Sequence, residues 1–377
     1  MAGLIVHDWL AKTGGSERVV EAMIEAFPDA HLQVLWDDAP DVDRGTTIHD
    51  TWLARTPLRL HKGACLPITP TVWRHVRAPY SPEWLLVSSH AFAHHVRLPS
   101  LPDIPKLAYV HTPARYVWMP EIDCRGDSPL ARLASRPLRT LDQRRAGELD
   151  AVAANSHYVA ARIARFWERE SEVIYPPVDV ADIISTTPTA QNRLSDGERR
   201  VIDELGREPF VLGASRLIPY KEVGQALRVG RLLGLPVVIA GSGPEEARLR
   251  AEAESLGVHA RFVIDPSTAL LRALFAQAVL YVFMAIEDFG IMPVESMASG
   301  TPVLACAEGG ASESVLACEG GAVVNERCDD LELISAAHAA LSVDVSEVAQ
   351  NAMMFDRSRF VREITAWVPQ SVGTKIP

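Results

Sequence analysis

The chain has 377 residues, a formal net charge of −11 and an apolar content of 48%. This length exceeds that of a typical single hydrophobic core and is near the size of two packed domains. The acidic balance excludes a general nucleic-acid binder, because neutralising phosphates requires a basic face. No run of 18 or more apolar residues is present, so the sequence predicts no membrane-spanning helix.

The cysteines and the N-terminus both indicate a cytoplasmic protein. Five cysteines are spread widely along the chain and contain no C-x-x-C pair, which argues against a disulfide framework and against a zinc site. The first 15 residues lack a basic region and a small-residue cleavage site, so we expect no cleaved signal peptide.

Short apolar runs alternate with amphipathic stretches along the whole chain, a pattern typical of parallel sheets covered by helices on both faces. The alternation runs twice and breaks at 176–200, a polar, proline-bearing stretch that we interpret as a connector and loop. We therefore place a domain boundary after Pro177. Pro137 is expected to kink or restart a helix over 128–149. The predicted strands are Leu4–Val6, Leu85–Ser88, Leu107–His111, Ala151–Asn155, Val173–Tyr175, Phe210–Ala214, Val237–Ala240, Phe262–Ile264, Leu280–Met284 and Val303–Ala305, and the other predicted helices are 16–27, 156–168, 223–234, 244–256, 267–277, 292–299 and 357–368.

The first candidate ligand loop of the N-terminal half is HDWLAKTGGSERVV. Gly14 and Gly15 stand next to the predicted helix start, where the backbone can approach a ligand closely. His111 ends an apolar strand, and a polar residue at that end of a parallel strand points to the ligand-binding edge. A structural role for His111 is the alternative.

The span 51–119 is basic although the chain is acidic. It holds eight Lys and Arg residues against two acids, a difference of 8 − 2 = +6, and six histidines besides. Such a surface suits a polyanionic or membrane-surface partner. The alternative is a solvated surface whose charges are balanced by spatial neighbours.

The C-terminal half contains three strings that suit an anionic ligand. Arg216 and Lys221 follow a strand and form a sensible pair for a diphosphate. Gly243 belongs to a Gly-x-Gly turn without the third glycine of the dinucleotide fingerprint. In EDFGIMPVE, Glu287 and Glu295 bracket a helix start, whose free N–H groups attract anions. Exposed surface charges are the alternative reading of each string alone.

These strings together resemble the family 4 retaining glycosyltransferases, and within them the bacterial O-antigen-type mannosyltransferases. The resemblance covers nearly the whole chain, through HDWLAKTGGSERVVEAMIEAFPDA, YVHTPARYVW, ANSHYVAARI, VIYPPVDV, SRLIPYK, EDFGIMPVESMASGTPV, GGASESV and FDRSRFVREI. It implies the GT-B fold, which has two Rossmann-like doubly wound α/β domains facing a central cleft. The implied domains are 1–177 on the acceptor side, 178–355 for the nucleotide sugar, and a helix at 356–377 that packs back toward the N-terminal domain.

The resemblance also implies a role for each candidate residue. Glu287 contacts donor-sugar hydroxyls, Glu295 the ribose, and Arg216 with Lys221 the diphosphate. His111 meets the donor sugar near the reacting carbon. The implied catalytic residues are His111, Arg216, Lys221 and Glu287, and the implied donor-binding residues are Gly14, Gly15, Gly243, Asp288, Phe289, Gly290, Ile291 and Glu295.

The implied activity is transfer of a hexose, with retention of configuration, to a glycan or lipid-linked acceptor. GDP-mannose is the first choice of donor. A UDP-sugar or another GDP-sugar stays open, because Val263-Ile264-Asp265 stands where the family has a glycine-containing strand end. A non-catalytic nucleotide-sugar-binding protein on the same fold is the other alternative. Contact with an anionic membrane at its inner face is expected, and nucleic acid is not.

The resemblance implies no cofactor and no metal. His90, His94 and His95 have the chemistry of metal ligands, but no neighbouring carboxylate or cysteine cluster accompanies them in the sequence. Asp41-Val42-Asp43 has the D-x-D form of metal-dependent sugar transferases, yet lies in a proline- and aspartate-rich segment that we interpret as a solvated loop.

Overall fold

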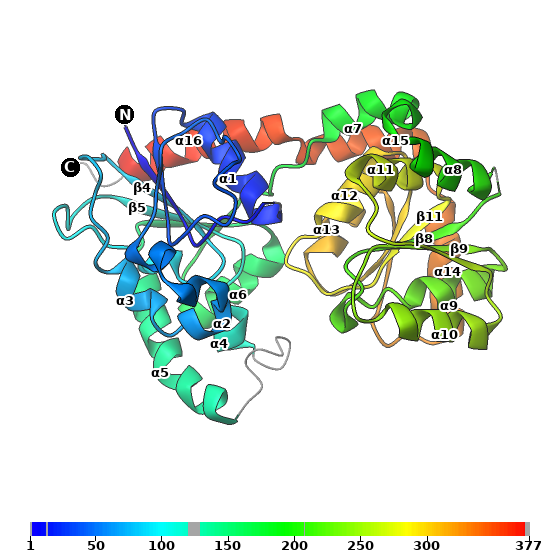
Figure 1. The fold of residues 1–377 in the computed structure, drawn as a ribbon, viewed down its shortest axis with the longest axis horizontal. Helices are drawn as coiled ribbons and strands as arrows, with labels where there is room; N and C mark the ends of the chain where they lie inside the picture. The colour runs from blue at the N-terminus through cyan, green and yellow to red at the C-terminus, as the bar shows by residue number, and fades with distance from the viewer. Residues whose placement is uncertain (1, 13, 120–128, 207, 374–377) are drawn as a thin grey trace. The chain divides into compact units, whose positions relative to one another are not determined.

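The computed structural model describes residues 2–12, 14–119, 129–206 and 208–373 (Figure 1). The chain divides into two compact units. Unit 1 is Met1–Pro177 with Ser358–Pro377, and unit 2 is Val178–Arg357. Each unit is built around one sheet whose strand pairs are all parallel, so the predicted α/β class is confirmed.

The seven strands of unit 1 have the order β3-β2-β1-β4-β5-β6-β7. Parallel pairing places the carboxyl ends of all these strands at one edge of the sheet. The strands are β1 (Leu4–His7), β2 (His31–Val34), β3 (Ile48–His49), β4 (Leu85–Ser89), β5 (Lys106–Val110), β6 (Ala151–Ala154) and β7 (Glu172–Val173).

Side chains of the central strands alternate between two apolar layers, one on each face of the sheet. In β1, Leu4 and Val6 belong to one layer and Ile5 to the other, as the two-residue period of a strand requires. Against the Ile5 layer pack α1 (Gly15–Ala26) and α16 (Arg357–Gly373), which lie side by side in Figure 1. The last helix thus contributes Phe360, Ile364 and Trp367 to the core of unit 1.

The other layer is covered by short helices and by two longer ones. They are η1 (Trp52–Arg55), η2 (Pro57–Leu60), α2 (Lys62–Cys65), α3 (Thr69–Trp73), η3 (Ala93–His95), α4 (Arg115–Trp118), α5 (Pro129–Ala146) and α6 (His157–Trp167). Pro137 lies inside α5, so of the two predicted outcomes, a kink or a restart, the restart does not occur. A proline inside a helix removes one backbone hydrogen bond without necessarily ending the helix.

A fully buried carboxylate, Asp142 on α5, ties this layer together. Its Oδ2 accepts hydrogen bonds from the indole N–H groups of Trp118 and Trp167, each at 2.7 Å. On the other side, the Nε2 atoms of His94 and His95 lie 3.0 and 2.9 Å from Oδ1. Burial opposes ionisation, but the two histidines outweigh it and hold the pKa of Asp142 well below its usual range.

This cluster corrects one premise of the sequence analysis. His94, His95 and Asp142 offer ligand atoms that lie within 4.8 Å of one another, so a carboxylate does accompany the histidines. The sequence hid it because Asp142 is 47 residues away from His95. The Trp118 and Trp167 indoles occupy the second carboxylate oxygen, which gives the cluster a structural role in joining α4, α5, α6 and η3.

The six strands of unit 2 have the order β10-β9-β8-β11-β12-β13. They are β8 (Val211–Ala214), β9 (Val237–Ala240), β10 (Ala260–Val263), β11 (Leu280–Phe283), β12 (Val303–Cys306) and β13 (Gly321–Val324). The helices are α7 (Val180–Thr186), η5 (Thr187–Arg193), α8 (Asp196–Leu205), η6 (Pro219–Lys221), α9 (Gln225–Leu233), α10 (Glu246–Leu256), α11 (Thr268–Gln277), α12 (Ile291–Ala298), α13 (Gly310–Ala317), α14 (Asp330–Leu341), α15 (Val345–Asn351) and η7 (Ala352–Phe355).

Helices cover both faces of this sheet. Apolar residues of α9, α10 and α14 form one layer with Val211, Ile239 and Val282. On the other face lie α11 and α12 (Figure 1), where Phe275 of α11 packs edge-on against Tyr281 at a ring distance of 5.0 Å. Tyr281 therefore points toward α12, the helix that begins after the Glu287 string.

The prediction of a connector and loop at 176–200 is wrong. The structure has α7, η5 and the start of α8 there. Ser195 caps α8 by accepting from the N–H of Glu198, and the Glu198 carboxylate accepts in return from the N–H of Ser195. This is the capping box that the string S-D-G-E predicts. Sequence reasoning overlooked it because the segment is polar and contains proline. Among the described residues, no helix is both long and apolar enough to cross a membrane.

We expect Asp142→Asn to lower the free energy of unfolding by about 3 kcal/mol or more, because it removes the buried negative charge that two indole N–H groups and two histidines surround. Chemical denaturation followed by tryptophan fluorescence measures the loss directly, since Trp118 and Trp167 contact this carboxylate. The control is Asp103→Asn on an exposed carboxylate, for which we expect a change within about 0.5 kcal/mol. Equal stability of the two variants would contradict the assigned role.

Candidate active site

The loops that follow β8, β9 and β11 meet at the carboxyl edge of the unit 2 sheet. Backbone hydrogen bonds hold the first two loops together: Leu217 donates to the carbonyl of Ser242 at 2.8 Å, and Glu245 donates to the carbonyl of Leu217 at 3.0 Å. The loop after β11 is held by Gly310, which donates to the carbonyl of Glu287 at 2.8 Å. Ligands of open parallel sheets bind at this edge.

Lys221 and Glu287 form an ion pair between the β8 and β11 loops. The Lys221 side chain is 8% exposed and the Glu287 side chain 22%, so the pair is shielded but open on one side. The Lys221 ammonium also lies 5.9 Å from the centre of the Phe283 ring. The structure thus brings together two residues that are 66 positions apart, and it holds the lysine charge beside the carboxylate.

Arg216 lies on the same loop but is exposed. Its Nη2 donates a hydrogen bond to the hydroxyl of Tyr220 at 2.8 Å, and the Tyr220 ring lies 5.4 Å from the Lys221 ammonium. Tyr220 therefore links the two cations that the sequence predicts for a diphosphate. Sequence reasoning missed Tyr220, although an aromatic residue between two cations in the chain is a signal that could have found it.

The helix α12 begins at Ile291 and has Gly290 as its N-cap. Gly290 has φ 84°, and a Cβ there would lie 3.0 Å from the Cβ of Ala311, so the turn favours glycine. The neighbouring Phe289 side chain is buried and packs on Phe355 at 5.6 Å. It anchors the loop, which leaves only the backbone of Phe289 to meet a ligand.

Glu295 is half-buried in α12, one turn beyond the helix start. Tyr281 connects it to Glu287: burial chiefly, with Glu287 and Glu295 adding to it, raises the pKa of Tyr281 well above its usual value. The Tyr281 hydroxyl donates to the carbonyl of Ala214 at 2.8 Å. The charges of both predicted carboxylates thus act on one buried phenol, whose hydroxyl lies at the end of β8.

Gly243 has a packing role that the sequence did not reveal. A Cβ at Gly243 would lie 2.3 Å from the carbonyl oxygen of Leu217, and one at Gly241 would lie 1.9 Å from that of Ser215. Both glycines let the β9 loop pack on the β8 loop that carries Arg216. The requirement for glycine at 243 follows from this contact, whatever ligand the edge binds.

His111 stands at the carboxyl edge of the unit 1 sheet. It follows β5 and is half-buried, and its Nε2 lies 2.8 Å from the hydroxyl of Ser88 at the end of β4. The same hydroxyl lies 3.0 Å from Nδ1 of His7, which ends β1 and is fully buried. Sequence reasoning found His111 and missed the other two, although the rule about polar residues at strand ends applies to them equally.

Gly14 is the N-cap of α1, and Gly15 is the first residue of that helix. The adjoining loop is tied down by Glu17, whose carboxylate accepts from the N–H of Ala11 and from the hydroxyl of Ser16, both at 2.9 Å. A Cβ at Gly14 would lie 2.1 Å from Oε2 of Glu17. The glycine pair thus leaves room for the Glu17 side chain beside the backbone that the sequence predicts for phosphate approach.

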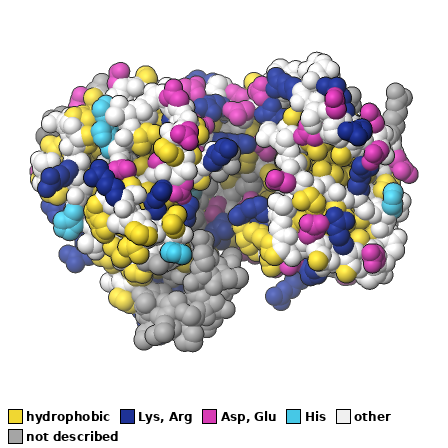
Figure 2. All heavy atoms as spheres, viewed as in Figure 1, with side chains coloured by type: hydrophobic (Ala, Val, Ile, Leu, Met, Phe, Trp, Pro, Cys, Tyr) yellow, Lys and Arg dark blue, Asp and Glu magenta, His cyan; other side chains and the backbone are white. Residues whose placement is uncertain are grey.

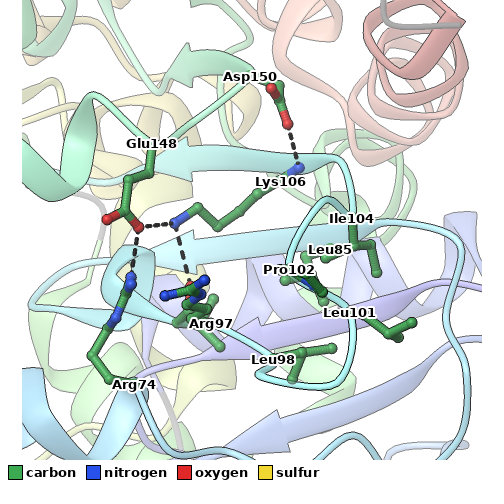
Figure 3. A pocket seen from close by; sticks show the side chains of 11 residues that line it. Arg74, Leu85, Arg97, Leu98, Leu101, Pro102, Ile104, Lys106, Glu148 and Asp150 are labelled. Atoms are coloured by element: carbon green, nitrogen blue, oxygen red, sulfur yellow. Dashed lines mark hydrogen bonds and ion pairs between the residues drawn. The ribbon is translucent and has the colours of Figure 1, made fainter.

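A separate cavity of about 280 Å³ lies at the opposite, amino edge of the unit 1 sheet, beside the first residues of β4 and β5. Figure 3 shows its charged side chains gathered on one side and apolar ones on the other. Glu148 accepts from Arg74 at 2.5 Å, from Arg145 at 2.6 Å and from Lys106 at 3.4 Å. Burial lowers the pKa of Lys106 to about 8, and the arginines and lysine bring that of Glu148 to about 2 against the opposing effect of its own burial. These charges satisfy one another, so the carboxyl edges remain the better candidates.

Comparison of the sequence with family models identifies the class of protein. The model of the Glycosyltransferase Family 4 matches residues 13–182, and the model of Glycosyl transferases group 1 matches residues 196–349. The chain belongs to this family of glycosyltransferases.

Among curated proteins, the chain is similar to mannosyltransferases and other glycosyltransferases. It is 32% identical over 220 residues to the GDP-mannose-dependent alpha-(1-6)-phosphatidylinositol monomannoside mannosyltransferase of Mycobacterium tuberculosis, covering 53% of this chain and 55% of that protein. It is 25% identical over 230 residues to the alpha-1,3/1,6-mannosyltransferase alg-2 of Neurospora crassa, covering 50% of this chain and 48% of that protein. The match thus spans about half the length of these relatives. The likeness to O-antigen-type mannosyltransferases stays a prediction.

Solved structures show the same fold over the whole chain. Anabaena Alr3699/HepE in complex with UDP superposes with a TM-score of 0.68 at 17% identity, covering 98% of this chain and 100% of that one. The alpha,alpha-trehalose 6-phosphate synthase of Burkholderia multivorans superposes with a TM-score of 0.72 at 15% identity and full coverage of both chains. These likenesses confirm the GT-B fold.

Proposed function

We propose that the protein is a retaining hexosyltransferase that moves mannose from GDP-mannose to a glycan or lipid-linked acceptor. The Lys221–Glu287 pair at the start of α12 carries this proposal. It sets a cation and a carboxylate side by side where a helix start offers free N–H groups. A nucleotide-diphosphate sugar needs both, because its phosphates are anionic and its sugar hydroxyls donate to carboxylates.

The choice of mannose and guanosine for the donor rests on the curated relatives, one of which is GDP-mannose-dependent by name. Uridine stays the alternative, since the similar Anabaena structure holds UDP. The proposed division of roles in unit 2 gives Glu287 the sugar hydroxyls, Glu295 the ribose, and Lys221 with Arg216 the diphosphate.

The proposed reaction is a displacement on one face of the sugar. The bond from the anomeric carbon to the phosphate oxygen breaks, and a bond from the same carbon to the acceptor oxygen forms on the same side. The acceptor proton passes to the leaving phosphate oxygen, so charges balance without a protein base. Arg216 and Lys221 stabilise the charge that develops on the diphosphate, an electrostatic role of the oxyanion-hole type. We propose that these cations and the start of α12 serve in place of a metal.

The first prediction from this proposal concerns the donor. With EDTA present, we expect GDP-mannose to raise the melting temperature and to be hydrolysed slowly, whereas UDP-glucose and UDP-GlcNAc do neither. Arg216→Gln should lower turnover about a hundredfold or more, the effect of losing one oxyanion-type donor. The control Arg231→Gln removes an exposed arginine that pairs with Asp330 and should leave turnover unchanged.

Three outcomes would contradict parts of the proposed function. Near-full turnover by Arg216→Gln would exclude stabilisation of the leaving diphosphate by Arg216. Turnover that EDTA abolishes and a divalent cation restores removes metal independence. A melting shift by GDP-mannose without any turnover in the wild type favours the non-catalytic binding protein.

We further propose that unit 1 binds an anionic membrane surface through the segment 52–68. Residues 51–82 contain five Lys and Arg and no Asp or Glu. Within this segment Trp52, Leu60 and Ile68 are exposed by 56%, 71% and 36%, and Figure 2 shows hydrophobic side chains gathered around α2 with basic ones beside them. Arg59 and Lys62 share one carboxylate, that of Asp38, so positive charge remains. Exposed aromatic and aliphatic side chains among cations are typical of membrane-surface binding.

The membrane proposal predicts that the protein sediments with vesicles containing phosphatidylglycerol and far less with phosphatidylcholine alone. The double variant Trp52→Ser/Leu60→Ser should weaken this binding at least about tenfold, the effect of removing roughly 1.5–3 kcal/mol per buried apolar side chain. The control Leu331→Ser changes an equally exposed leucine of unit 2 and should have no effect. Equal sedimentation with both vesicle types at low salt would contradict the proposal.

A further inference from the structure

Strand register lines up three polar side chains at the carboxyl edge of unit 1. His7 and Ser88 are direct partners in the β1–β4 pairing, and His111 follows β5 and donates its backbone N–H to the carbonyl of Ser89. Because side chains alternate along a strand, His7 shares the face of Ile5, Ser88 that of Leu86, and His111 that of Tyr109, all in one apolar layer. Ser89 points to the other face, where its hydroxyl lies 3.0 Å from Nδ1 of His94.

The contacts of His7 fix which of its ring nitrogens carries the proton. Nδ1 of His7 lies 3.1 Å from the backbone carbonyl oxygen of Ser88 and 3.0 Å from the Ser88 hydroxyl. A carbonyl oxygen only accepts hydrogen bonds. Nδ1 of His7 must therefore be the protonated nitrogen, which leaves Nε2 as an acceptor. That Nε2 atom is buried and has no hydrogen-bond partner among the described residues.

The hydroxyl of Ser88 links the protonation of His7 to the position of the ring proton in His111. Since the Ser88 oxygen accepts from His7, its own hydrogen is free to donate to Nε2 of His111 at 2.8 Å. A neutral imidazole has one donor and one acceptor nitrogen. When the Ser88 hydrogen is donated in this way, Nε2 of His111 is the acceptor and the ring proton sits on Nδ1, the nitrogen left for a ligand.

The surroundings keep both rings neutral. Burial, together with neighbouring His90, lowers the pKa of His7 to about 4. Burial, His90 and His7 likewise hold the pKa of His111 well below its usual value. The ring centres of His7 and His90 are 5.2 Å apart, and those of His90 and His111 are 6.3 Å apart. At neutral pH neither His7 nor His111 carries a second proton that would disturb the chain of donors.

We propose that His7 and Ser88 are positioning residues that hold His111 as its Nδ1–H tautomer, so that His111 donates a hydrogen bond to an oxygen of the sugar substrate. The role of the sugar rests on the proposed function, whereas the tautomer does not. In this state His111 has no free lone pair and does not act as a general base. This fits a reaction in which the leaving phosphate takes the acceptor proton.

The tautomer is tested by ¹⁵N NMR of histidine-labelled protein, with the His111 signals assigned by their loss in His111→Gln. We expect Nδ1 of His111 to give the signal of a protonated nitrogen and Nε2 that of an acceptor nitrogen. Ser88→Ala should abolish this preference, because the donor to Nε2 is gone. Ser89→Ala is the matched control on the opposite face and should preserve it. A wild type with the proton on Nε2, or a Ser88→Ala variant with unchanged His111 signals, would overturn the proposal.

Kinetics test whether the tautomer matters for turnover. We expect Ser88→Ala and His7→Gln to lower kcat about tenfold to a hundredfold, by analogy with losing the outer partner of a metal-ligating histidine, with the donor KM nearly unchanged. His7→Asn should restore most of kcat, since its amide N–H can take the place of Nδ1–H. Should Ser88→Ala fold poorly, the two His7 variants make the same comparison. Wild-type kcat in His7→Gln would overturn the positioning role. Absence of any turnover in the wild type would instead refute the proposed function, and the NMR result would still stand.

Discussion

The parallel pairing of every strand in both sheets is the constraint on which the rest of this structure depends. Parallel strands place all their carboxyl ends at one edge, so residues far apart in the chain meet there. Lys221 and Glu287 become an ion pair through this geometry, and His7, Ser88 and His111 become one hydrogen-bonded row. Without parallel register, neither cluster would form.

The sequence predicted the fold well where strands are apolar and buried on both faces. Such strands have a continuous apolar pattern, and β1, β8, β9 and β11 are of this kind. Three strands were missed: β2 and β3, which contain His31, Gln33 and His49, and β13, which begins with glycine and alanine. Their identity as strands comes from tertiary pairing, which a local pattern does not report.

For unit 2, the sequence predicted which loops carry the candidate residues, but it did not predict how these residues contact one another. The start of α12 at Ile291 agrees with the helix start inferred from the glutamate string. The link from Arg216 through Tyr220 to Lys221 and the packing role of Gly243 depend on loop geometry. The sequence did not predict the Asp142 cluster of unit 1 for the same reason, since its aspartate, histidines and tryptophans come from four separate elements. The roles of all these residues in substrate binding remain predictions.

Hydrogen–deuterium exchange with and without saturating GDP-mannose is the decisive measurement for the donor site, because it locates the donor on the chain. We expect slower exchange in peptides covering 215–222 and 286–298, with no change at 98–106 beside the amino-edge cavity of unit 1. Protection confined to 98–106, or no protection anywhere at saturating donor, would contradict the assignment of the donor site to the carboxyl edge of unit 2.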